Sequence, residues 1–558
     1  MSALAEIRDL RVEATTDAGR RVEIIKGVSL SVAEGEMVAL IGESGSGKTT
    51  IALSLLGHAR EGCRIAGGSV VVAGQDMARM TERQRAKVRG TTVSYVPQSA
   101  AAAFNPSLRV MQQVIEITRI HRLMPRAEAE ARAVALFRAL SLPEPEQIGA
   151  RYPHQLSGGQ LQRLAAAMAM IGDPRLVVFD EPTTALDVTT QIEVLRAIKS
   201  VMRGSRTGGV YVSHDLAIVA QVADRIVVLR DGAVQEEGPT TQILSAPRHP
   251  YTQALLAAFR PASAARAAPA AAVLAVAPEA PPPVLEVRDV SAGYGWLPGR
   301  PVPLIRAVRD VSFQVERGRN VGIIGESGCG KSTLARTIAG IMPACGGGLL
   351  LEGQALAPLA RDRSREQLRR LQIVFQSADT ALNPARPIGE ILGRPLVFYH
   401  GLRGAARDAR VDELLDMVQL PRALRHRHAA ELSGGQKQRV NLARALAAEP
   451  SVILCDEITS ALDTVVAAAI IELLRELQNG LGLSYVFISH DLPTVQAICD
   501  EVVVMRGGEK LEQCLAMQVW DPSGHPYSQL LMASVPRLDP SWLDGLDHHP
   551  QLGRAPPG

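Results

Sequence analysis

The chain has 558 residues, more than one hydrophobic core usually organises, so we expect at least two domains. Lys and Arg number 60 against 57 Asp and Glu, a net charge of +3, and this near balance gives no support for a nucleic-acid or anionic-membrane footprint. No apolar run reaches the roughly 18 to 20 residues of a membrane-spanning helix, and the six cysteines form no Cys-x-x-Cys pair. We therefore expect a cytosolic chain that can sit on a membrane protein.

Composition and repeated motifs divide the chain into four parts. Residues 1–260 form a first domain, 261–283 a linker, 284–535 a second domain and 536–558 a C-terminal tail. The linker is almost wholly Ala and Pro, a composition that builds no packed core and favours extended chain. The same motifs occur in the same order on both sides of it, so the sequence predicts a duplicated unit.

In chain order, each domain begins with β-rich segments and continues with a buried strand, a glycine-rich loop and a helix. Helix-forming stretches at 101–142 and 381–418 resemble an inserted helical subdomain. Later apolar runs lead into polar motifs, as buried parallel strands do. The predicted fold class is α/β, with a mostly parallel sheet, an antiparallel β part and a helical insert in each domain. The expected strands are 37–41, 176–179, 209–212, 320–324, 452–455 and 485–488.

A phosphate-binding pattern, Gly-x-x-x-x-Gly-Lys-Ser/Thr, follows the first buried strand of each domain. Its glycines let backbone N–H groups curl around phosphate oxygens at the start of a helix, whose dipole favours anions. A plain glycine turn is the alternative for one copy, but two ordered copies argue against it. We expect the lysines at the terminal phosphates and the hydroxyls of Thr49 and Ser332 on Mg²⁺. The predicted nucleotide-binding residues are Gly42, Glu43, Ser44, Gly45, Ser46, Gly47, Lys48, Thr49, Thr50, Gly325, Glu326, Ser327, Gly328, Cys329, Gly330, Lys331, Ser332 and Thr333.

Consecutive acids end a later strand in each domain. We expect Asp180 and Asp456 to hold Mg²⁺, and Glu181 and Glu457 to act as general bases toward the attacking water, because phosphoryl transfer chiefly needs a positioned nucleophile and neutralised charge. His214 and His490 follow the next strands and are assigned to the γ-phosphate, although a histidine after a strand is more often structural. Glu181 and Glu457, like His214 and His490, are 276 residues apart, so this part of the unit keeps its register.

The sequence Leu-Ser-Gly-Gly-Gln follows each helical insert, at 156–160 and at 432–436. Both resemble the signature of ATP-binding-cassette nucleotide-binding domains, and the resemblance covers nearly all of the chain outside the linker and the last residues. It implies that Gln98 and Gln376 contact Mg²⁺ and sense a membrane partner. The loops at 185–187 and 461–463 are similar to those that cross the centre of a cassette pair. The signature residues, predicted to bind nucleotide, are Ser157, Gly158, Gly159, Gln160, Ser433, Gly434, Gly435 and Gln436.

The resemblance also implies how the two domains cooperate. In this family two cassettes close head to tail around ATP, so here Lys48 is expected to pair with Ser433, and Lys331 with Ser157, within one chain. ATP favours closure because a signature helix start offers donors to the γ-phosphate that ADP lacks.

Aromatic residues distinguish the domains. Tyr294 stands where the family stacks a ring on adenine, and aligning Arg8-Asp9 with Arg288-Asp289 places Ala14 there in the first domain, which predicts weaker stacking.

Two His-Pro-Tyr segments, beginning at His249 and His525, are similar to the C-terminal segment of oligopeptide, dipeptide and nickel importers of this family. As bare sequence they predict only a turn that enters a helix.

The resemblance implies an ATP-hydrolysing subunit, with ATP and Mg²⁺ as cofactors, peripheral on the cytoplasmic face of the cell membrane. Two separate membrane-spanning permease subunits and an extracytoplasmic solute-binding protein are the expected partners, and nucleic acid is not. Di- or oligopeptides are the expected solutes; nickel, glutathione or another solute is an alternative, as is an exporter. A soluble tandem ATPase acting on ribosomes or DNA is a further alternative, which the nearly uncharged linker disfavours.

Overall fold

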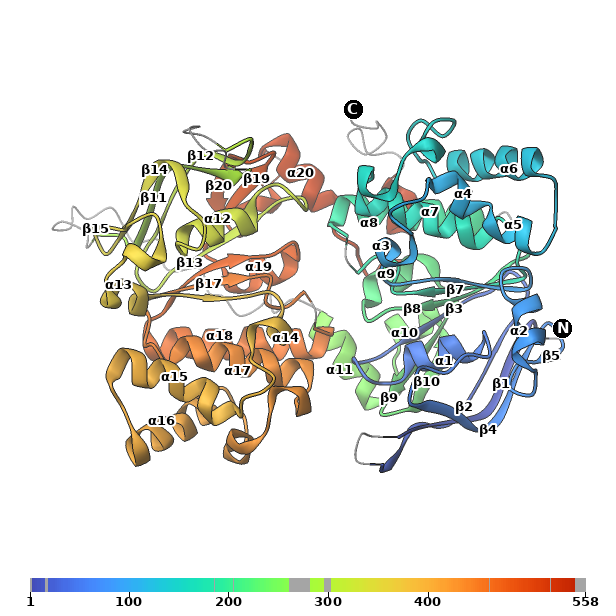
Figure 1. Ribbon diagram of the computed structural model, residues 1–558, viewed down its shortest axis with the longest axis horizontal. Coiled ribbons are helices and arrows are strands. Elements are labelled where there is room, and N and C mark those ends of the chain that lie inside the picture. Colours follow the sequence, from blue (N-terminus) through green and yellow to red (C-terminus); the bar gives the residue numbers. More distant parts are fainter. Residues whose placement is uncertain are drawn as a thin grey trace. The chain divides into compact units, whose positions relative to one another are not determined.

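The computed structural model describes residues 3–15, 19–184, 186–203, 205–259, 282–295, 303–460, 462–521 and 523–546. The chain forms two compact units (Figure 1): the first holds Met1–Phe259 and Pro536–Gly558, and the second Arg260–Val535. The predicted linker, apart from its last two residues, and the part of the predicted tail after residue 546 lie outside the described residues. So do Ala185 and Ala461 of the two expected central loops.

A six-stranded sheet forms the centre of the first unit. Its strand order is β10-β9-β3-β8-β7-β6, parallel except that β10 pairs antiparallel with β9. Every residue of β3, β7 and β8 is buried, as expected for parallel strands covered on both faces. The strands are β3 (Met37–Ile41), β6 (Val93–Val96), β7 (Leu176–Asp180), β8 (Gly208–Val212), β9 (Arg225–Arg230) and β10 (Ala233–Pro239).

The second unit repeats this sheet. Its order is β16-β17-β18-β13-β19-β20, again parallel apart from the last pair. The α/β fold and the six strands expected from sequence are therefore confirmed, each within one residue. The strands are β13 (Asn320–Ile324), β16 (Leu371–Val374), β17 (Val452–Asp456), β18 (Ser484–Ile488), β19 (Glu501–Arg506) and β20 (Glu509–Leu515).

An antiparallel sheet accompanies each central sheet. The strand orders are β2-β1-β4-β5 and β12-β11-β14-β15, and in each unit one hydrophobic core joins the antiparallel sheet to the central one. Asp9 and Asp289 occupy the same place in β1 and β11 with φ angles of 45° and 46°, which supports the alignment of Ala14 with Tyr294. The strands are β1 (Ala5–Thr15), β2 (Arg21–Val32), β4 (Cys63–Val72), β5 (Gln75–Asp76), β11 (Leu285–Tyr294), β12 (Ile305–Val315), β14 (Ala344–Leu351) and β15 (Gln354–Ala355).

Helices complete the first unit, and the predicted stretch 101–142 is helical but broken. One helix ends at Ile120, and Pro125 is the N-cap residue of the next, where its missing N–H costs no helical hydrogen bond. The helices are α1 (Lys48–Ser54), α2 (Glu82–Val88), α3 (Ala100–Ala103), α4 (Val110–Val114), α5 (Glu116–Ile120), α6 (Arg126–Ala139), α7 (Gly158–Met170), α8 (Val188–Arg203), α9 (Leu216–Val222), α10 (Thr240–Ser245) and α11 (Pro250–Phe259).

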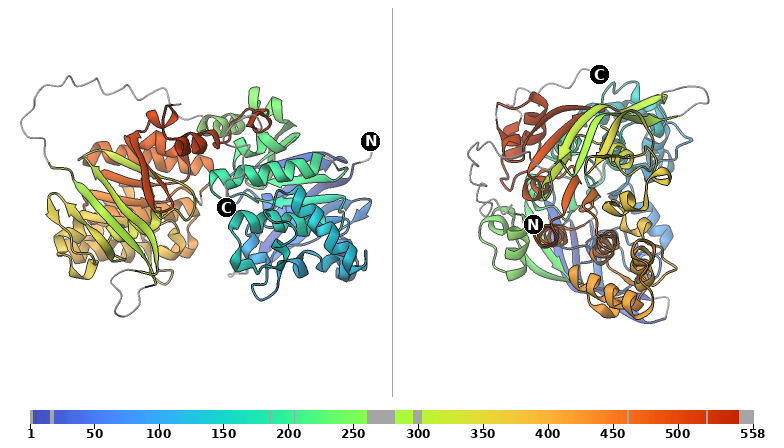
Figure 2. Two further views of the ribbon diagram at one scale, coloured as in Figure 1. Left: turned by 90° about the horizontal axis from the view of Figure 1, so that it is seen from above. Right: turned by 90° about the vertical axis from the view of Figure 1, so that its left-hand side faces the viewer.

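The second unit has the same helical plan. Its predicted insert is helical, and in Figures 1 and 2 α15 and α16 lie on the side of the central sheet away from β11, β12 and β14. The helices are α12 (Lys331–Ile338), α13 (Arg365–Arg370), α14 (Ala378–Ala381), α15 (Ile388–His400), α16 (Gly404–Met417), α17 (Gly434–Leu446), α18 (Thr464–Leu481), α19 (Leu492–Ile498) and α20 (Pro526–Ala533).

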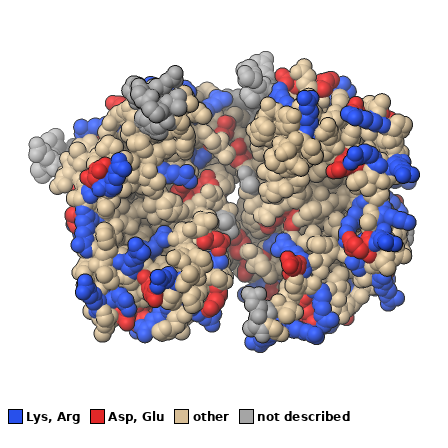
Figure 3. Space-filling model, viewed as in Figure 1, with Lys and Arg blue, Asp and Glu red and all other residues tan. Residues whose placement is uncertain are grey.

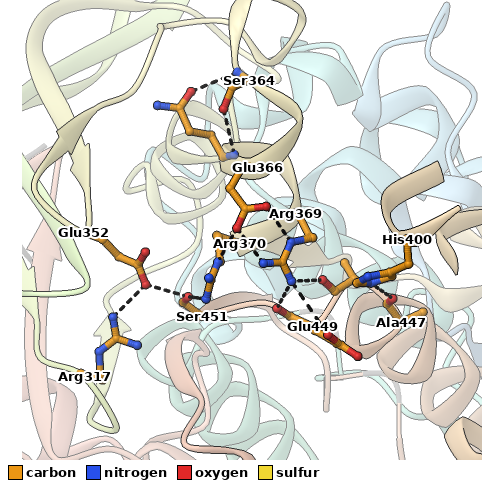
Figure 4. Close-up of polar contacts among 12 residues, drawn as sticks. Arg317, Glu352, Ser364, Glu366, Arg369, Arg370, His400, Ala447, Glu449 and Ser451 are labelled. Atoms are coloured by element: carbon orange, nitrogen blue, oxygen red, sulfur yellow. Dashed lines mark hydrogen bonds and ion pairs between the residues drawn. The ribbon is translucent and has the colours of Figure 1, made fainter.

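A polar network in the second unit joins α13 to the start of β17 and the end of β14 (Figure 4). Glu366 accepts hydrogen bonds from Arg369 and Arg370, which hold its pKa down at about 2. Arg369 also donates to two backbone carbonyls beyond α17, and Arg370 reaches Ser451 at 3.3 Å, whose hydroxyl donates to Glu352 at 2.9 Å. The network thus connects segments that are far apart in sequence.

The C-terminal segment 536–546 packs on the first unit. Gln221 of α9 is only 2% exposed, and its amide nitrogen donates to the carbonyls of Arg537 and Asp539 at 2.7 and 2.9 Å. Its amide oxygen accepts from the N–H of Leu543 at 3.0 Å, within the short helix α21 (Trp542–Gly545). Lys199 of α8 forms an ion pair with Asp544 at 2.9 Å. One buried glutamine therefore satisfies three backbone groups of this segment.

The surface gives no single electrostatic signature. Figure 3 shows Lys and Arg side chains interspersed with Asp and Glu over the displayed face of each unit. Within the described ranges, the helices are all too short or too polar to cross a membrane.

Candidate functional site

The glycine-rich loops lie at the carboxyl end of β3 and β13, in the centre of each parallel sheet, where α/β proteins gather ligands. Gly42 has a φ of 149°, and a Cβ there would lie 2.0 Å from the carbonyl oxygen of Leu229. Gly325 has the same φ and would meet the carbonyl of Met505 at 2.1 Å. Only glycine fits at these two positions, so the backbone passes close to the neighbouring strand and turns directly into α1 or α12.

The loop lysines are buried and fold over their own loops. Lys48 donates to the carbonyls of Gly42 and Glu43 at 2.7 and 2.9 Å. Lys331 donates to those of Gly325 and Glu326, both at 2.8 Å. Each ammonium is therefore held at the mouth of its loop, where a phosphate oxygen can replace a carbonyl as its acceptor.

A hydroxyl and a carboxylate meet beside each loop. Thr49 donates to Asp180 at 2.9 Å, and Ser332 donates to Asp456 at 2.9 Å, across 131 and 124 residues of sequence. Burial raises the pKa of both aspartates, partly offset by these hydrogen bonds. Hard oxygen donors grouped in this way suit Mg²⁺, which binds proteins through one or two such ligands and keeps several waters. The residues present thus fit the predicted metal.

A glutamine and a histidine meet at each glutamate. Gln98 donates to Glu181 at 3.1 Å, and His214 lies 3.2 Å from the other carboxylate oxygen. In the second unit Gln376 donates to Glu457 at 2.7 Å, and His490 lies 3.5 Å away. The structure therefore brings the predicted base, histidine and glutamine together in both units.

The backbone and charge at these glutamates are unusual. Their φ angles are 47° and 50°, a strained conformation for a residue with a side chain and one that clusters at functional sites. Burial alone would raise the pKa of Glu181, but the hydrogen bond and charge of His214, together with Lys48, outweigh it and lower the pKa. Burial would likewise lower the pKa of His214, and Glu181 reverses it. The same balance holds for Glu457 and His490. Each glutamate is thus ionised at neutral pH.

The signature segments are helix starts. Ser157 caps α7 by accepting from the N–H of Gln160 at 3.3 Å, while the Gln160 side chain accepts from the N–H of Ser157 at 3.0 Å. Ser433 and Gln436 form the same reciprocal cap on α17, at 3.4 and 3.1 Å. The signature glutamine therefore serves the helix cap, and the exposed serine and first glycine remain available to a ligand. Asp187 and Asp463, of the expected central loops, accept backbone N–H groups at the starts of α8 and α18.

The predicted adenine side differs between units. Tyr294 is 41% exposed, and its hydroxyl lies 2.9 Å from Thr333, directly after the phosphate loop. In β1 the corresponding residue is Ala14, paired with Val22 and Cys63. An aromatic face is therefore offered beside one loop and not beside the other.

Some contacts were not predicted from the sequence. Tyr95 donates to the second oxygen of Asp180 at 2.8 Å, whereas the second unit has Ile373 at the corresponding position in β16. Tyr251 and Tyr527, from the His-Pro-Tyr segments, reach the phosphate loops at 3.2 and 3.1 Å. The duplicated His-Pro-Tyr segments were a sequence signal for the contacts of Tyr251 and Tyr527. Tyr95 occurs in one unit only, so no sequence signal pointed to its contact with Asp180.

Comparison with known proteins agrees with this geometry. The family described as ABC transporter matches residues 25–184 and 308–460, and the family described as oligopeptide/dipeptide transporter, C-terminal region, matches 235–279 and 511–557. The glutathione import ATP-binding protein GsiA of Salmonella choleraesuis (strain SC-B67) is 36% identical over 549 residues, covering 94% of this chain and 88% of that protein. The protein of the same name from Escherichia coli (strain K12) is 36% identical over 551 residues, with the same coverage.

Among solved structures, the dimeric post-hydrolysis state of the ATP-binding cassette MJ0796 bound to ADP and Pi is similar. It is 26% identical, with a TM-score of 0.38, and the match covers 42% of this chain and 98% of that one.

Proposed function

This chain belongs to the ABC transporter family, and on that premise we propose that it is the ATP-hydrolysing subunit of an importer, with small peptides as solutes. One observation carries the proposal. Both units hold the complete set of nucleotide-handling side chains, and both end in the region typical of oligopeptide and dipeptide transporters. Neither site lacks a group that hydrolysis needs.

The loops and lysines bind the triphosphate. Backbone N–H groups of the loop surround its phosphate oxygens at the start of α1 or α12, and Lys48 or Lys331 exchanges its loop carbonyls for the terminal phosphates. Thr49 and Asp180, or Ser332 and Asp456, would hold Mg²⁺, which would supply positive charge to neutralise the phosphates. The raised pKa of each buried aspartate fits a carboxylate awaiting such a charge.

The glutamates direct the attacking water. Glu181 or Glu457, kept ionised by its histidine, orients the water and accepts its proton as the bond from water to the γ-phosphorus forms and the bond from that phosphorus to the leaving oxygen of ADP breaks. His214 or His490, whose pKa is raised by that pairing, faces the charge that develops on the γ-phosphate. Gln98 and Gln376 donate hydrogen bonds to these same carboxylates. A membrane partner that moves the segment containing either glutamine therefore alters the position of the base.

We further propose that the units close head to tail around two ATP molecules. Each phosphate loop then faces the other unit's signature serine, Lys48 with Ser433 and Lys331 with Ser157, and the exposed helix starts of α7 and α17 supply donors to the γ-phosphate. ATP thus stabilises the closed state, and hydrolysis releases it.

A signature variant tests this pairing. Ser433→Arg is expected to abolish ATP-driven closure at the Lys48 site, because a long cation displaces the donor from the γ-phosphate. Chemical crosslinking between the units with and without ATP reports closure. Ser205→Arg, a serine in the same chain outside the signature segments, serves as the control. Unchanged closure in Ser433→Arg contradicts the head-to-tail arrangement.

The partners proposed are two permease subunits, an extracytoplasmic binding protein and the cytoplasmic face of the cell membrane. A tripeptide such as glutathione, named for relatives 36% identical to this chain, falls within the small-peptide class.

Reconstitution tests the solute. The chain is purified with its co-purifying permease and binding protein and placed in liposomes, and ATP hydrolysis is measured with dipeptides, longer peptides, glutathione or Ni²⁺. Stimulation by peptides, glutathione included, is expected. Stimulation by nickel alone, or co-purification with ribosomes instead of membrane proteins, contradicts the proposal.

A further inference from the structure

The His-Pro-Tyr segments build the starts of α11 and α20 in the same way. The ring nitrogen Nδ1 of His249 accepts from the N–H of Tyr251 at 3.2 Å, and that of His525 accepts from Tyr527 at 3.1 Å. Proline follows as the first helical residue, where its missing N–H costs no helical bond. Histidine and proline thus have local roles in the helix start, and the tyrosine side chain is free to serve another part of the unit.

A carboxylate on the last sheet strand anchors each helix start. Glu236 of β10 accepts from the backbone N–H groups of Arg248 and His249 at 2.9 and 3.0 Å. Burial would raise its pKa, but these bonds outweigh it and lower the pKa to about 2. In the second unit Glu512 of β20 accepts from the N–H of His525 and from the Ser528 hydroxyl. The helix therefore cannot shift without breaking bonds to the central sheet.

The anchored tyrosines reach the phosphate loops. The hydroxyl of Tyr251 accepts from the backbone N–H of Glu43 at 3.2 Å, and that of Tyr527 accepts from Glu326 at 3.1 Å, over 208 and 201 residues of sequence. Both tyrosines are buried. A guanidinium lies over each ring, Arg230 at 4.8 Å and Arg506 at 4.9 Å from the ring centre. The ring position is thus fixed from both the helix and the neighbouring strand.

The peptide group that each tyrosine holds also carries the loop lysine. The N–H of Glu43 and the carbonyl of Gly42 belong to one planar unit, and that carbonyl accepts from Lys48 at 2.7 Å. Turning this plane to break one bond therefore misdirects the other. Since Gly42 has a φ of 149°, which only glycine adopts readily, its own backbone gives little resistance to such a turn. The second unit has the same arrangement at Gly325 and Lys331.

We propose that Tyr251 and Tyr527 are positioning residues for the nucleoside triphosphate. Each holds the first peptide group of its phosphate loop, and through it the loop lysine, in the orientation that receives the terminal phosphates. The C-terminal segment of each unit is thereby a working part of the nucleotide site. This inference rests on the proposed ATP hydrolysis.

The test removes only the two hydroxyls. Tyr251→Phe/Tyr527→Phe in the full chain keeps both rings and their arginines, so the fold is retained. Loss of one net hydrogen bond per site predicts a KM for ATP about 3- to 10-fold higher, and a matching loss in equilibrium binding of a fluorescent ATP analogue, with a smaller change in kcat.

A matched control separates positioning from stability. Tyr485→Phe removes another buried tyrosine hydroxyl in the second unit, one that donates to the carbonyl of Leu474 at 3.1 Å. It is expected to lower Tm and leave the KM for ATP unchanged. A double variant whose KM and analogue binding stay within twofold of the parent overturns the inference, as does an equal rise in KM in the Tyr485 control. A parent chain that hydrolyses no ATP overturns instead the function on which the inference rests.

Discussion

The two units differ at the edges of their nucleotide sites and agree at the centres. Around the glutamate, the metal-binding pair and the lysine, the distances of the two units agree within 0.4 Å. At the adenine side the second unit has Tyr294 where the first has Ala14, and at the metal side the first has Tyr95 where the second has Ile373. Duplication has therefore kept the side chains proposed for hydrolysis, and we expect the nucleotide affinities of the two sites to differ.

A third difference concerns the C-terminal segment. Gln221 of the first unit binds residues 537–543, and the residue 276 positions later in the second unit is Ala497, which offers no side-chain amide. The chain passes between the units at residues 259–260 and again at 535–536, so this segment returns to the unit in which the chain began. Among the described residues, this glutamine contact lies in the first unit, which makes the two units unequal despite their common fold.

The largest expected effect tests what the units share. Replacing both bases, Glu181→Gln/Glu457→Gln, should lower kcat for ATP hydrolysis by about 10²- to 10⁴-fold, because the amide cannot accept the proton of the attacking water. ATP binding should persist, since neither glutamate is assigned to phosphate binding. Steady-state phosphate release measures the first effect. A double variant that retains more than a tenth of parental kcat contradicts the assignment.

The second largest expected effect concerns adenine stacking and tests the difference between Tyr294 and Ala14. Tyr294→Ala should weaken ATP binding at the Lys331 site by about 5- to 150-fold, corresponding to about 1–3 kcal/mol per stacked base. Tyr294→Phe keeps the ring, loses only the contact with Thr333, and should bind nearly as the parent does. Calorimetric titration should resolve a tight and a weak site in the parent. Equal affinities at the two sites, or no loss in Tyr294→Ala, contradict the role of the ring.

A smaller effect than that of Tyr294→Ala is expected when the C-terminal segment is released from the first unit. Gln221→Ala removes the three hydrogen bonds to this segment and leaves backbone groups unpaired, which should destabilise the docked segment by about 1–3 kcal/mol. Hydrogen exchange of the amides in 537–545 should accelerate accordingly. Ala497→Gln, the matching position in the second unit, should leave that exchange unchanged. Slow exchange in Gln221→Ala would show that other contacts hold the segment.

The smallest effect is a shift with pH. His214→Ala removes the partner that lowers the pKa of Glu181, while the burial that raises it remains, so this pKa should rise. The base then becomes protonated at a higher pH, and the acid limb of the kcat profile should move toward neutral pH. His490→Ala should act likewise on Glu457, and His58→Ala, at an exposed site, should not. An acid limb that stays in place or moves to lower pH contradicts the pairing.

Sequence alone predicted the elements that are defined by a local pattern of residues. The glycine loops, the Asp-Glu strand ends and the parallel strands depend on patterns of a few residues, and the structure brings their side chains together as the repeated order of motifs suggested. The difference between Tyr294 and Ala14 was also visible, because a short motif aligned the two β-rich segments.

The remaining contacts depend on tertiary structure. Tyr251 and Glu43 are 208 residues apart, and their contact needs β9, β10 and α11 to be in place. Tyr95 faces Asp180 only because adjacent parallel strands align Val96 with Phe179, and no local pattern encodes that register. The docking of the C-terminal segment on Gln221 could not be predicted from the sequence either, because a single glutamine in a helix is no recognisable motif.

One measurement tests the central claim, that both units are complete nucleotide sites. The hydrolysis-deficient Glu181→Gln/Glu457→Gln chain is equilibrated with saturating radiolabelled ATP and Mg²⁺, freed of unbound nucleotide by rapid gel filtration, and assayed for bound ATP. The account predicts two ATP molecules per chain. One ATP per chain, or none, would contradict it.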